Sequence, residues 1–222
     1  MTMLQSDFED AISKLTEPVN GQYPRPWMTD LTDPLSADVF LVGKNQRNGY
    51  ETSRLTHERH LAALFNRNGE SCRGVYDEMT AHRPSPTRVN ADRFRKALAV
   101  EGVSRVLETN VVCYSTPMSS DLRLPQHKGG SIRGSNIFLA LLHFIQPKVL
   151  IAHGTGTRDT LTQLLGSSLP TPPASVTEAQ PVIVGALKVF VIPSLAPPQW
   201  NQWKNWAEPY LTNVAKAVAS AL

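Results

Sequence analysis

The stretch "KVLIAHGTGTRDTLTQLLG", residues 148–166, decides the fold. Its opening part, 148–153, is an almost continuous apolar run, which is typical of a strand covered on both faces of a parallel sheet. A helical pattern follows directly in 157–166 and ends at Gly166, a residue type that commonly terminates helices. A strand that runs straight into a helix is the repeating unit of an α/β sheet, so further strands of the same kind are expected on both sides.

The rest of the chain repeats this alternation. Further apolar runs predict strands at 38–43, 105–113 and 187–193, and a short edge strand at 182–184 that turns back at Gly185. Helical patterns lie at 51–69, at 90–103 with Asn90 as N-cap, at 136–147, and at 208–222 with Pro209 in the first turn. The predicted fold class is α/β: a three-layer α/β/α sandwich around a mainly parallel central sheet of about four strands.

Composition and charge narrow the protein class. The chain has 222 residues, 41% of them hydrophobic and 18% charged, which predicts one globular domain over 1–222. The N-terminal "MTMLQSDFEDAISKL" predicts an amphipathic helix and is acidic where a secretion signal is positive, and no apolar run has the length of a membrane span. We therefore expect a cytoplasmic protein with no membrane partner. The net charge of +3 permits nucleic-acid binding.

The sequence predicts neither a metal site nor a cofactor. Two cysteines are too few for a disulfide framework, and no Cys/His cluster has zinc-ligand spacing. His57 and His60 can share a helix face but lack a third ligand nearby. "GTGTRD" has Asp159 where a dinucleotide loop needs its third glycine, and "HKGGSIRG" lacks the spacing of a phosphate-binding loop.

Ligands of an open parallel sheet bind beyond the carboxyl ends of its strands. The four predicted strands end in "GKNQRNGYE", "TNVVCYSTP", "HGTGTRD" and "PSLAPPQW", all rich in Gly, Asn, Ser, Thr and Pro. Four such ends at one edge of the sheet predict a ligand site there.

In this order, the four ends resemble the motifs of the uracil-DNA glycosylase superfamily over residues 38–200. "VGKNQ" resembles the first motif, with Asn45 as in the mismatch- and thymine-type branch and Gln46 in place of the usual proline. "ETNVVCYSTP" and "QPKVLIAHGTGT" resemble the second and third motifs of the iron–sulfur branch, although two cysteines cannot hold its cluster. "IPSLAP" matches the Pro-Ser core of the last motif, with Ile192 in place of the usual histidine.

The resemblance implies a role for each matching residue. Asn45 would hold the attacking water and Ser194 would contact a phosphate beside the flipped nucleotide; these two are the predicted catalytic residues. Asn110 would read the base edge, amides after Gly43 would bind a base carbonyl, and Tyr50 would stack on the base. The other predicted contacts are Lys44, Gln46 and His153 to the substrate, and Arg47, Pro193, Pro197, Gln199 and Trp200 to DNA, with Gln199 or Trp200 as a wedge into the vacated stack.

Several of these residues have a purely structural interpretation as well. Asn45 can be a turn residue that caps a helix, and Asn110 a core asparagine bonded to the backbone. Tyr50 can simply be packed, and the spacing of Trp200 with two later tryptophans is typical of helix packing. A second basic loop, "HRPSPTR" at 82–88, is either a solvated surface loop or a source of phosphate contacts.

The resemblance predicts a DNA glycosylase that excises a damaged or modified base. Its predicted partner is DNA, which can be single-stranded or modified. No lysine replaces a motif residue, which predicts base excision without strand cleavage. Two other functions stay open: a protein that binds nucleic acid or a modified base without catalysis, and a hydrolase of free nucleosides or nucleotides.

Overall fold

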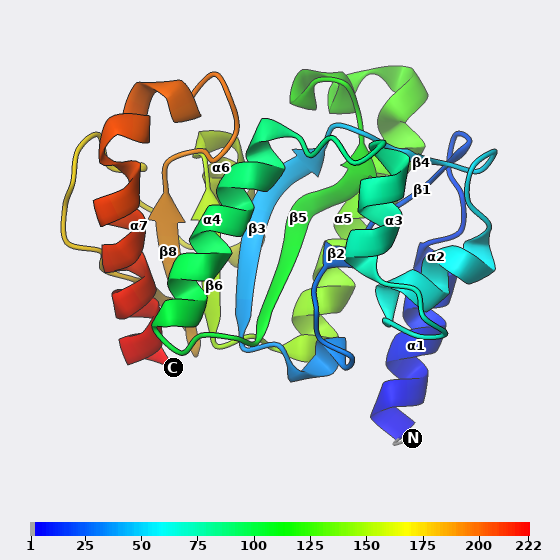
Figure 1. Ribbon diagram of the computed structural model, residues 1–222, viewed down its shortest axis with the longest axis horizontal. Coiled ribbons are helices and arrows are strands. Elements are labelled where there is room, and N and C mark those ends of the chain that lie inside the picture. The colour runs from blue at the N-terminus through cyan, green and yellow to red at the C-terminus, as the bar shows by residue number, and fades with distance from the viewer. Residues whose placement is uncertain (1–2) are drawn as a thin grey trace. The chain divides into compact units, whose positions relative to one another are not determined.

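The computed structural model describes residues 3–222 and has a six-stranded, mostly parallel sheet (Figure 1). The strands lie in the order β2-β5-β3-β6-β8-β7, so the α/β sandwich class is confirmed. Their bounds are β2 Trp27–Met28, β3 Val39–Gln46, β5 Val106–Ser115, β6 Val149–His153, β7 Val182–Val184 and β8 Leu187–Ile192. A separate two-stranded sheet pairs β1 Gln22–Tyr23 with β4 Tyr50–Glu51.

All four predicted core strands and the edge strand are present. β3, β6 and β8 run parallel, and β7 turns back antiparallel onto β8. β3 also runs parallel to β5. The two strands are hydrogen-bonded at both ends in the same direction: Asp38 N–H donates to Arg105 O where they begin, and Thr116 N–H donates to Gln46 O where they end. The sheet has one strand more than the four predicted core strands and the predicted edge strand β7, because the antiparallel strand β2 borders its other edge.

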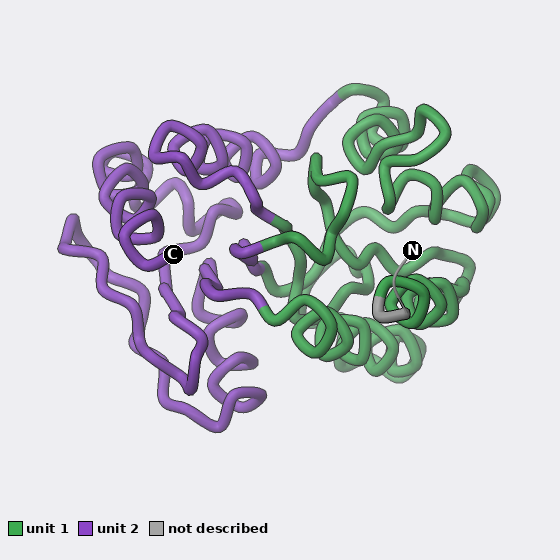
Figure 2. The backbone as a smooth tube through the Cα atoms, turned by 90° about the horizontal axis from the view of Figure 1, so that it is seen from below, with its two compact units in different colours: residues 1–37, 43–82, 107–146 green, residues 38–42, 83–106, 147–222 purple. Residues whose placement is uncertain are grey.

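Packing divides the chain into two compact units (Figure 2). Unit 1 holds the described residues up to 37 together with 43–82 and 107–146. Unit 2 holds 38–42, 83–106 and 147–222, so β3 begins in unit 2 and ends in unit 1. The prediction of a single domain stays a prediction.

Unit 2 is a layered sheet-and-helix core. Its helices are α4 Pro86–Val100, α6 Thr155–Leu165 and α7 Trp200–Ala221. α4 and α7 pack together over one face of β3, β6 and β8, where Phe94, Ile151 and Phe190 are fully or almost fully buried (Figure 1). α6 contacts β6 and ends at Gly166 in the left-handed conformation, as predicted.

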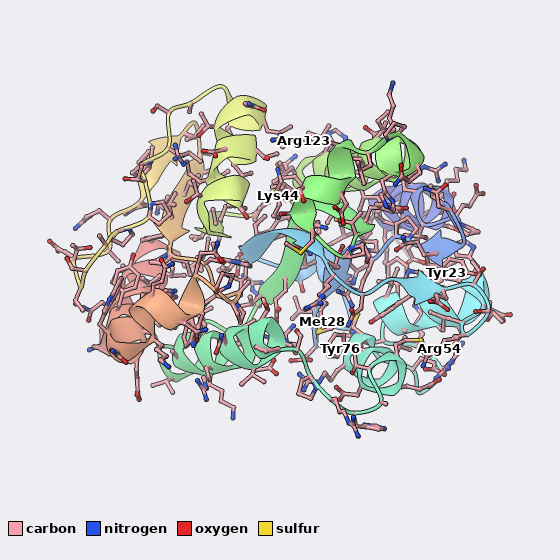
Figure 3. The ribbon with its side chains drawn as sticks, turned by 90° about the horizontal axis from the view of Figure 1, so that it is seen from above. Tyr23, Met28, Lys44, Arg54, Tyr76 and Arg123 are labelled. Carbon is pink, nitrogen blue, oxygen red and sulfur yellow. The ribbon has the colours of Figure 1, made fainter. Side chains whose placement is uncertain are left out.

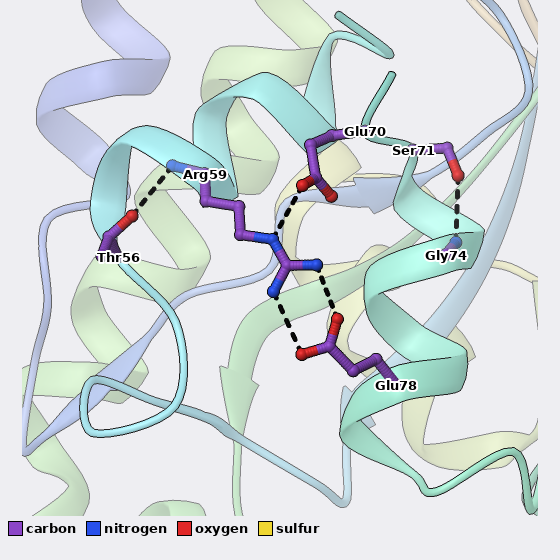
Figure 4. Close-up of polar contacts among 6 residues, drawn as sticks. All are labelled: Thr56, Arg59, Glu70, Ser71, Gly74 and Glu78. Carbon is purple, nitrogen blue, oxygen red and sulfur yellow. Dashed lines mark hydrogen bonds and ion pairs between the residues drawn. The ribbon is translucent and has the colours of Figure 1, made fainter. Parts of the chain in front are cut away.

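Unit 1 is built around α1 Met3–Leu15, α2 His57–Leu64, α3 Cys72–Met79 and α5 Lys128–Ile145. The predicted N-terminal amphipathic helix is confirmed, with Phe8 and Ile12 buried, although residues 1 and 2 lie outside the described part. The Arg59 guanidinium joins α2 to α3: it donates to Glu70 at 2.8 Å and to both carboxylate oxygens of Glu78 (Figure 4).

The predicted helix starts are less accurate. α4 begins five residues early, because Ser85 caps it and Pro86 takes the first helical position, so Asn90 as N-cap is wrong. Asn90 is instead buried inside the helix and donates to Leu195 O at 2.9 Å. α7 begins at Trp200 rather than at Pro209, which lies inside the helix. α3 was not predicted; the apparent helix at 51–69 is only the short α2.

None of the described helices combines the length and the apolar character needed to span a membrane.

Candidate functional site

The end of β3 carries the first predicted site residues, all in unit 1. β3 continues through Gly43, Lys44 and Asn45 to Gln46, so these residues lie on a strand rather than in a turn. Gly43 is buried, whereas Lys44 and Asn45 are partly exposed. Figure 3 looks onto the end at which β3 finishes and labels Lys44 there. The helix-capping alternative for Asn45 is therefore wrong.

Asn45 is held in one orientation by its neighbours. Its Nδ2 donates to Thr116 Oγ1 at 2.8 Å and to Gln46 O at 3.1 Å. The single hydroxyl hydrogen of Thr116 is donated to Met118 O at 2.7 Å. Thr116 can therefore only accept from Asn45, which requires the amide nitrogen to face it. The Asn45 Oδ1 is left without a partner among the described residues and is free to accept a hydrogen bond from a ligand or water.

Gln46 faces the protein interior. Its side chain is buried, and Nε2 donates to Arg25 O at 2.8 Å. Its Oε1 is buried with no hydrogen-bond partner among the described residues. The amide nitrogen of Gln46 therefore links the segment around Arg25 to the end of β3.

β5 is sharply bent at Asn110. The Thr109 hydroxyl lies 3.5 Å from Cys113 Sγ, and Cys113 Sγ lies 3.2 Å from Asn110 O. In a regular strand, residues four apart are separated by about 13 Å. Such irregularities are over-represented beside active sites, where they redirect a side chain.

Asn110 itself is partly exposed at this bend. Its side chain makes no hydrogen bond to another described residue, so it is not the backbone-bonded core asparagine that the sequence also allowed. The bend is braced by the segment around Pro26: Thr109 Oγ1 donates to Pro26 O at 2.6 Å, and Arg25 N–H donates to Cys113 O at 3.2 Å. The Asn110 amide, with its donor and acceptor, is available to a ligand.

Tyr50 is packed inside unit 1. It is 4% exposed, the Arg25 guanidinium lies 5.0 Å from its ring centroid, and the His60 ring meets it in a T-shaped contact. Burial raises the pKa of its hydroxyl. This environment matches the packed alternative for Tyr50 and leaves its ring no open face for a base.

Unit 1 contains further buried titratable groups: His60 and Cys72 lie near Tyr50, and Cys113 lies on β5. His60 Nε2 donates to Pro24 O at 2.9 Å, and burial lowers the pKa of His60 to about 4. Burial raises the pKa of Cys72 and of Cys113 to about 11, so both thiols stay protonated and unreactive near neutral pH. Within residues 3–222, no group of three or more His, Cys, Asp or Glu side chains could hold a metal ion.

In unit 2, the end of β6 approaches the end of β8. Gly154 follows β6 with φ +86° and donates its N–H to Ile192 O at 2.9 Å. A Cβ at Gly154 would lie 3.1 Å from the Cβ of Ser194, so glycine suits both the backbone angle and the close approach. Burial lowers the pKa of His153 to about 4, and its Nδ1 has no hydrogen-bond partner among the described residues.

Two hydrogen bonds hold the turn at Ser194. Ser194 Oγ accepts from Ala196 N–H at 3.2 Å, and its carbonyl accepts from Trp203 Nε1 at 2.8 Å. Pro193 before it is buried, and so is Ile192, which occupies the histidine position of the resemblance. The Ser194 hydroxyl hydrogen remains available to an acceptor such as a phosphate oxygen.

The segment after this turn contains both exposed and packed residues. Pro197 and Gln199 are exposed. Trp200 is partly buried, and its ring centroid lies 4.7 Å from that of Trp203, which matches the helix-packing alternative.

Arg47, predicted to contact DNA, is exposed, and so is Arg83 in the basic loop 82–88. Arg88, the other arginine of that loop, is 7% exposed and forms an ion pair with Asp92 at 2.9 Å, so it does not serve the phosphate-contact alternative for the loop.

Sequence reasoning missed Thr116 and Met118. Thr116 follows β5 directly, and its place in "CYSTP" next to a strand end was a usable signal for a polar site residue. Its pairing with Asn45, 71 positions earlier, had no local signal.

Comparison with known proteins assigns no family. No model of a protein family matches the chain, and no curated protein sequence matches it significantly.

Proposed function

We propose that the protein is a cytoplasmic, monofunctional DNA glycosylase related to the uracil-DNA glycosylase superfamily, which hydrolyses the N-glycosidic bond of a flipped, damaged or modified base. One observation carries the proposal: the Asn45 amide is locked through its nitrogen and presents an unpartnered Oδ1. Asn110, at the bend of β5, supplies a second amide that is not used within the protein.

In the proposed reaction, the target nucleotide is extruded from the stack, which costs a few kcal/mol. A water donates a hydrogen bond to Asn45 Oδ1, and its oxygen attacks the anomeric carbon as the bond to the base breaks. The electron pair of that bond leaves with the base, in a transition state of oxocarbenium character. A neutral amide does not accept a proton near pH 7, so the water proton passes to solvent, and the rate depends on positioning and on a good leaving group.

Other residues would bind the substrate. The Asn110 amide can donate to and accept from a Watson–Crick edge. Backbone N–H groups after Gly43 would bind a base carbonyl as negative charge develops. Taken by itself, unit 2 offers the Ser194 hydroxyl as a donor to a phosphate oxygen of DNA, and the two hydrogen bonds that hold its turn lower the ordering cost of such a contact.

A second candidate function is binding of a modified base without catalysis. Ile192 favours it, because a fully buried apolar side chain stands where a histidine would donate to the departing base.

The experiment is an excision assay with purified full-length protein. Duplexes and single strands carrying uracil, hypoxanthine, a thymine mismatch or a bulky modified pyrimidine are incubated with it, and abasic sites are cleaved with alkali. Free nucleosides are assayed in parallel for release of the base.

Abasic sites on at least one polynucleotide, without strand cleavage before alkali, are the expected result. Tight binding with no abasic sites on any substrate would favour the second candidate function, binding without catalysis. Release of base from free nucleosides alone would favour the nucleoside hydrolase.

A further inference from the structure

The chain projects a short tip directly after β5, within unit 1. We call residues 117–128 the β5 tip. It consists of two 3-10 turns, Ser119–Arg123 and Pro125–His127, and leads into α5. Figure 1 shows these turns beyond the end of β5.

The β5 tip exposes two large apolar side chains. Met118 is 64% exposed and Leu124 is 41% exposed. Leu122 between them is buried and anchors the turn. Single exposed apolar residues are common, but two on one short turn next to a candidate site suit contact with a partner.

The β5 tip is held by its own hydrogen bonds. Asp121 Oδ2 accepts from Met118 N–H at 2.9 Å, and Asp121 N–H donates back to Met118 O at 3.0 Å. Leu124 N–H donates to Asp121 O at 2.9 Å, and the Tyr114 hydroxyl lies 3.2 Å from His127 Nδ1. A side chain on such a preformed turn loses less conformational freedom when it binds.

The β5 tip is coupled to the candidate site. Met118 O accepts the hydroxyl hydrogen of Thr116, and the same hydroxyl accepts from Asn45. A displacement of Met118 therefore acts on the group that orients the Asn45 amide.

The charge of the β5 tip suits an anionic partner. Arg123, labelled in Figure 3, and Lys128 are exposed, and neither forms an ion pair with a described residue. The carboxylate of Asp121 is engaged within the turn. This combination is complementary to a nucleic-acid duplex: the cations can contact the phosphates, and the exposed apolar side chains can contact the stacked bases between them.

We propose that the β5 tip inserts Met118 into the base stack of a DNA duplex and fills the space that a flipped nucleotide leaves, with Arg123 and Lys128 on the adjacent phosphates. This inference rests on the proposed function. It places the wedge on the β5 tip rather than at Gln199 or Trp200.

The test uses a duplex with 2-aminopurine next to an abasic-site analogue, because unstacking raises the fluorescence of 2-aminopurine. Binding and fluorescence are measured with the native chain, Met118→Ala, Met118→Leu and Val100→Ala. Val100 is 82% exposed on α4 and serves as the matched control for loss of an exposed apolar side chain. Thermal unfolding of each variant checks that it folds.

The native chain, Met118→Leu and Val100→Ala should raise the fluorescence at saturation, and Met118→Ala should lose at least half of that rise. The double variant Arg123→Gln/Lys128→Gln should lower the salt slope of duplex binding by about 2, one unit for each lost phosphate contact.

An undiminished rise with Met118→Ala, while abasic sites are still produced on a substrate, would overturn the wedge and leave the proposed function intact. No binding to any duplex and no abasic sites on any substrate would overturn both. Binding to single strands alone, or to protein or lipid surfaces instead, would also overturn the wedge.

Discussion

At the scale of the residue, the proposed site depends on the amide of Asn45 and the hydroxyl of Thr116. In the proposed reaction Asn45 cannot act as a base, so it would contribute only the position of Oδ1, which its hydrogen bond to Thr116 helps to set. Thr116 donates its only hydroxyl hydrogen to Met118 O. If the Asn45 amide were turned so that its oxygen faced Thr116, the bond between Asn45 and Thr116 would be lost, so the amide has one favourable orientation.

Thr116→Val should lower the single-turnover rate of base excision about five- to tenfold, because one hydrogen bond of about 1 kcal/mol no longer orients the amide. Duplex affinity should change less than the rate. Thr116→Ser keeps the hydroxyl and should restore most of the activity. Equal rates for Thr116→Val and Thr116→Ser would mean that the hydroxyl does not position Asn45.

At the scale of the element, the approach of α5 to β5 explains the glycines of "HKGGSIRG". A Cβ at Gly134 would lie 2.9 Å from Cys113 N, and one at Gly130 would lie 2.3 Å from the Tyr114 ring. These glycines serve the contact between helix and strand rather than a phosphate. At Gly129, by contrast, the nearest atom to an added Cβ is 4.0 Å away.

Gly134→Ala should destabilise the protein by about 1–3 kcal/mol, the usual cost of an overpacked contact. Gly129→Ala adds the same methyl group to the same helix without a clash, and should stabilise it by up to about 1 kcal/mol through helix propensity. Urea denaturation of both variants measures the difference. A Gly134→Ala variant as stable as Gly129→Ala would show that α5 does not approach β5 so closely.

Helix starts illustrate what local patterns miss. α7 continues through Pro209 because the carbonyl four residues before it belongs to the exposed Asn205, which water can satisfy. α4 starts at Pro86, since Ser85 and Pro86 together supply a cap and a first turn. The Ser85–Pro86 signal was in the sequence but was outweighed by Asn90, which also suits a helix start, whereas no side-chain cap at Gln199 marks the start of α7.

At the scale of the whole molecule, the sequence predicted the core strands and not the bend of β5. Long apolar runs such as 148–153 identify a strand by themselves, whereas the two-residue β2 has no periodicity. The bend at Asn110 depends on contacts with Pro26, 84 positions earlier than Asn110, and such pairing leaves no local pattern. Tyr50 was predicted to stack on a base because the sequence around it does not show that its side chain is buried.

Acid should destabilise the whole molecule through His60 in unit 1 and His153 in unit 2. Each takes up a proton near pH 6.5 when unfolded but only at about pH 4 when folded. Between these values the unfolded state binds more protons, so the free energy of unfolding falls as pH falls, by up to about 3 kcal/mol per histidine.

Denaturation of the native chain and of His60→Gln/His153→Gln at pH 7, 5.5 and 4.5 measures this effect. The double variant should lose much less stability over that range than the native chain. The same pH dependence in both proteins would assign the acid sensitivity to other groups.

The central claim is that Asn45 Oδ1 positions the water that releases the base. The most direct measurement is the single-turnover rate of abasic-site formation by the native chain and by Asn45→Ala, on the best substrate of the excision assay. The account predicts a loss of about 100-fold in rate, the usual scale for a misplaced reactant, with duplex affinity nearly unchanged. An Asn45→Ala variant that forms abasic sites at the native rate would contradict it.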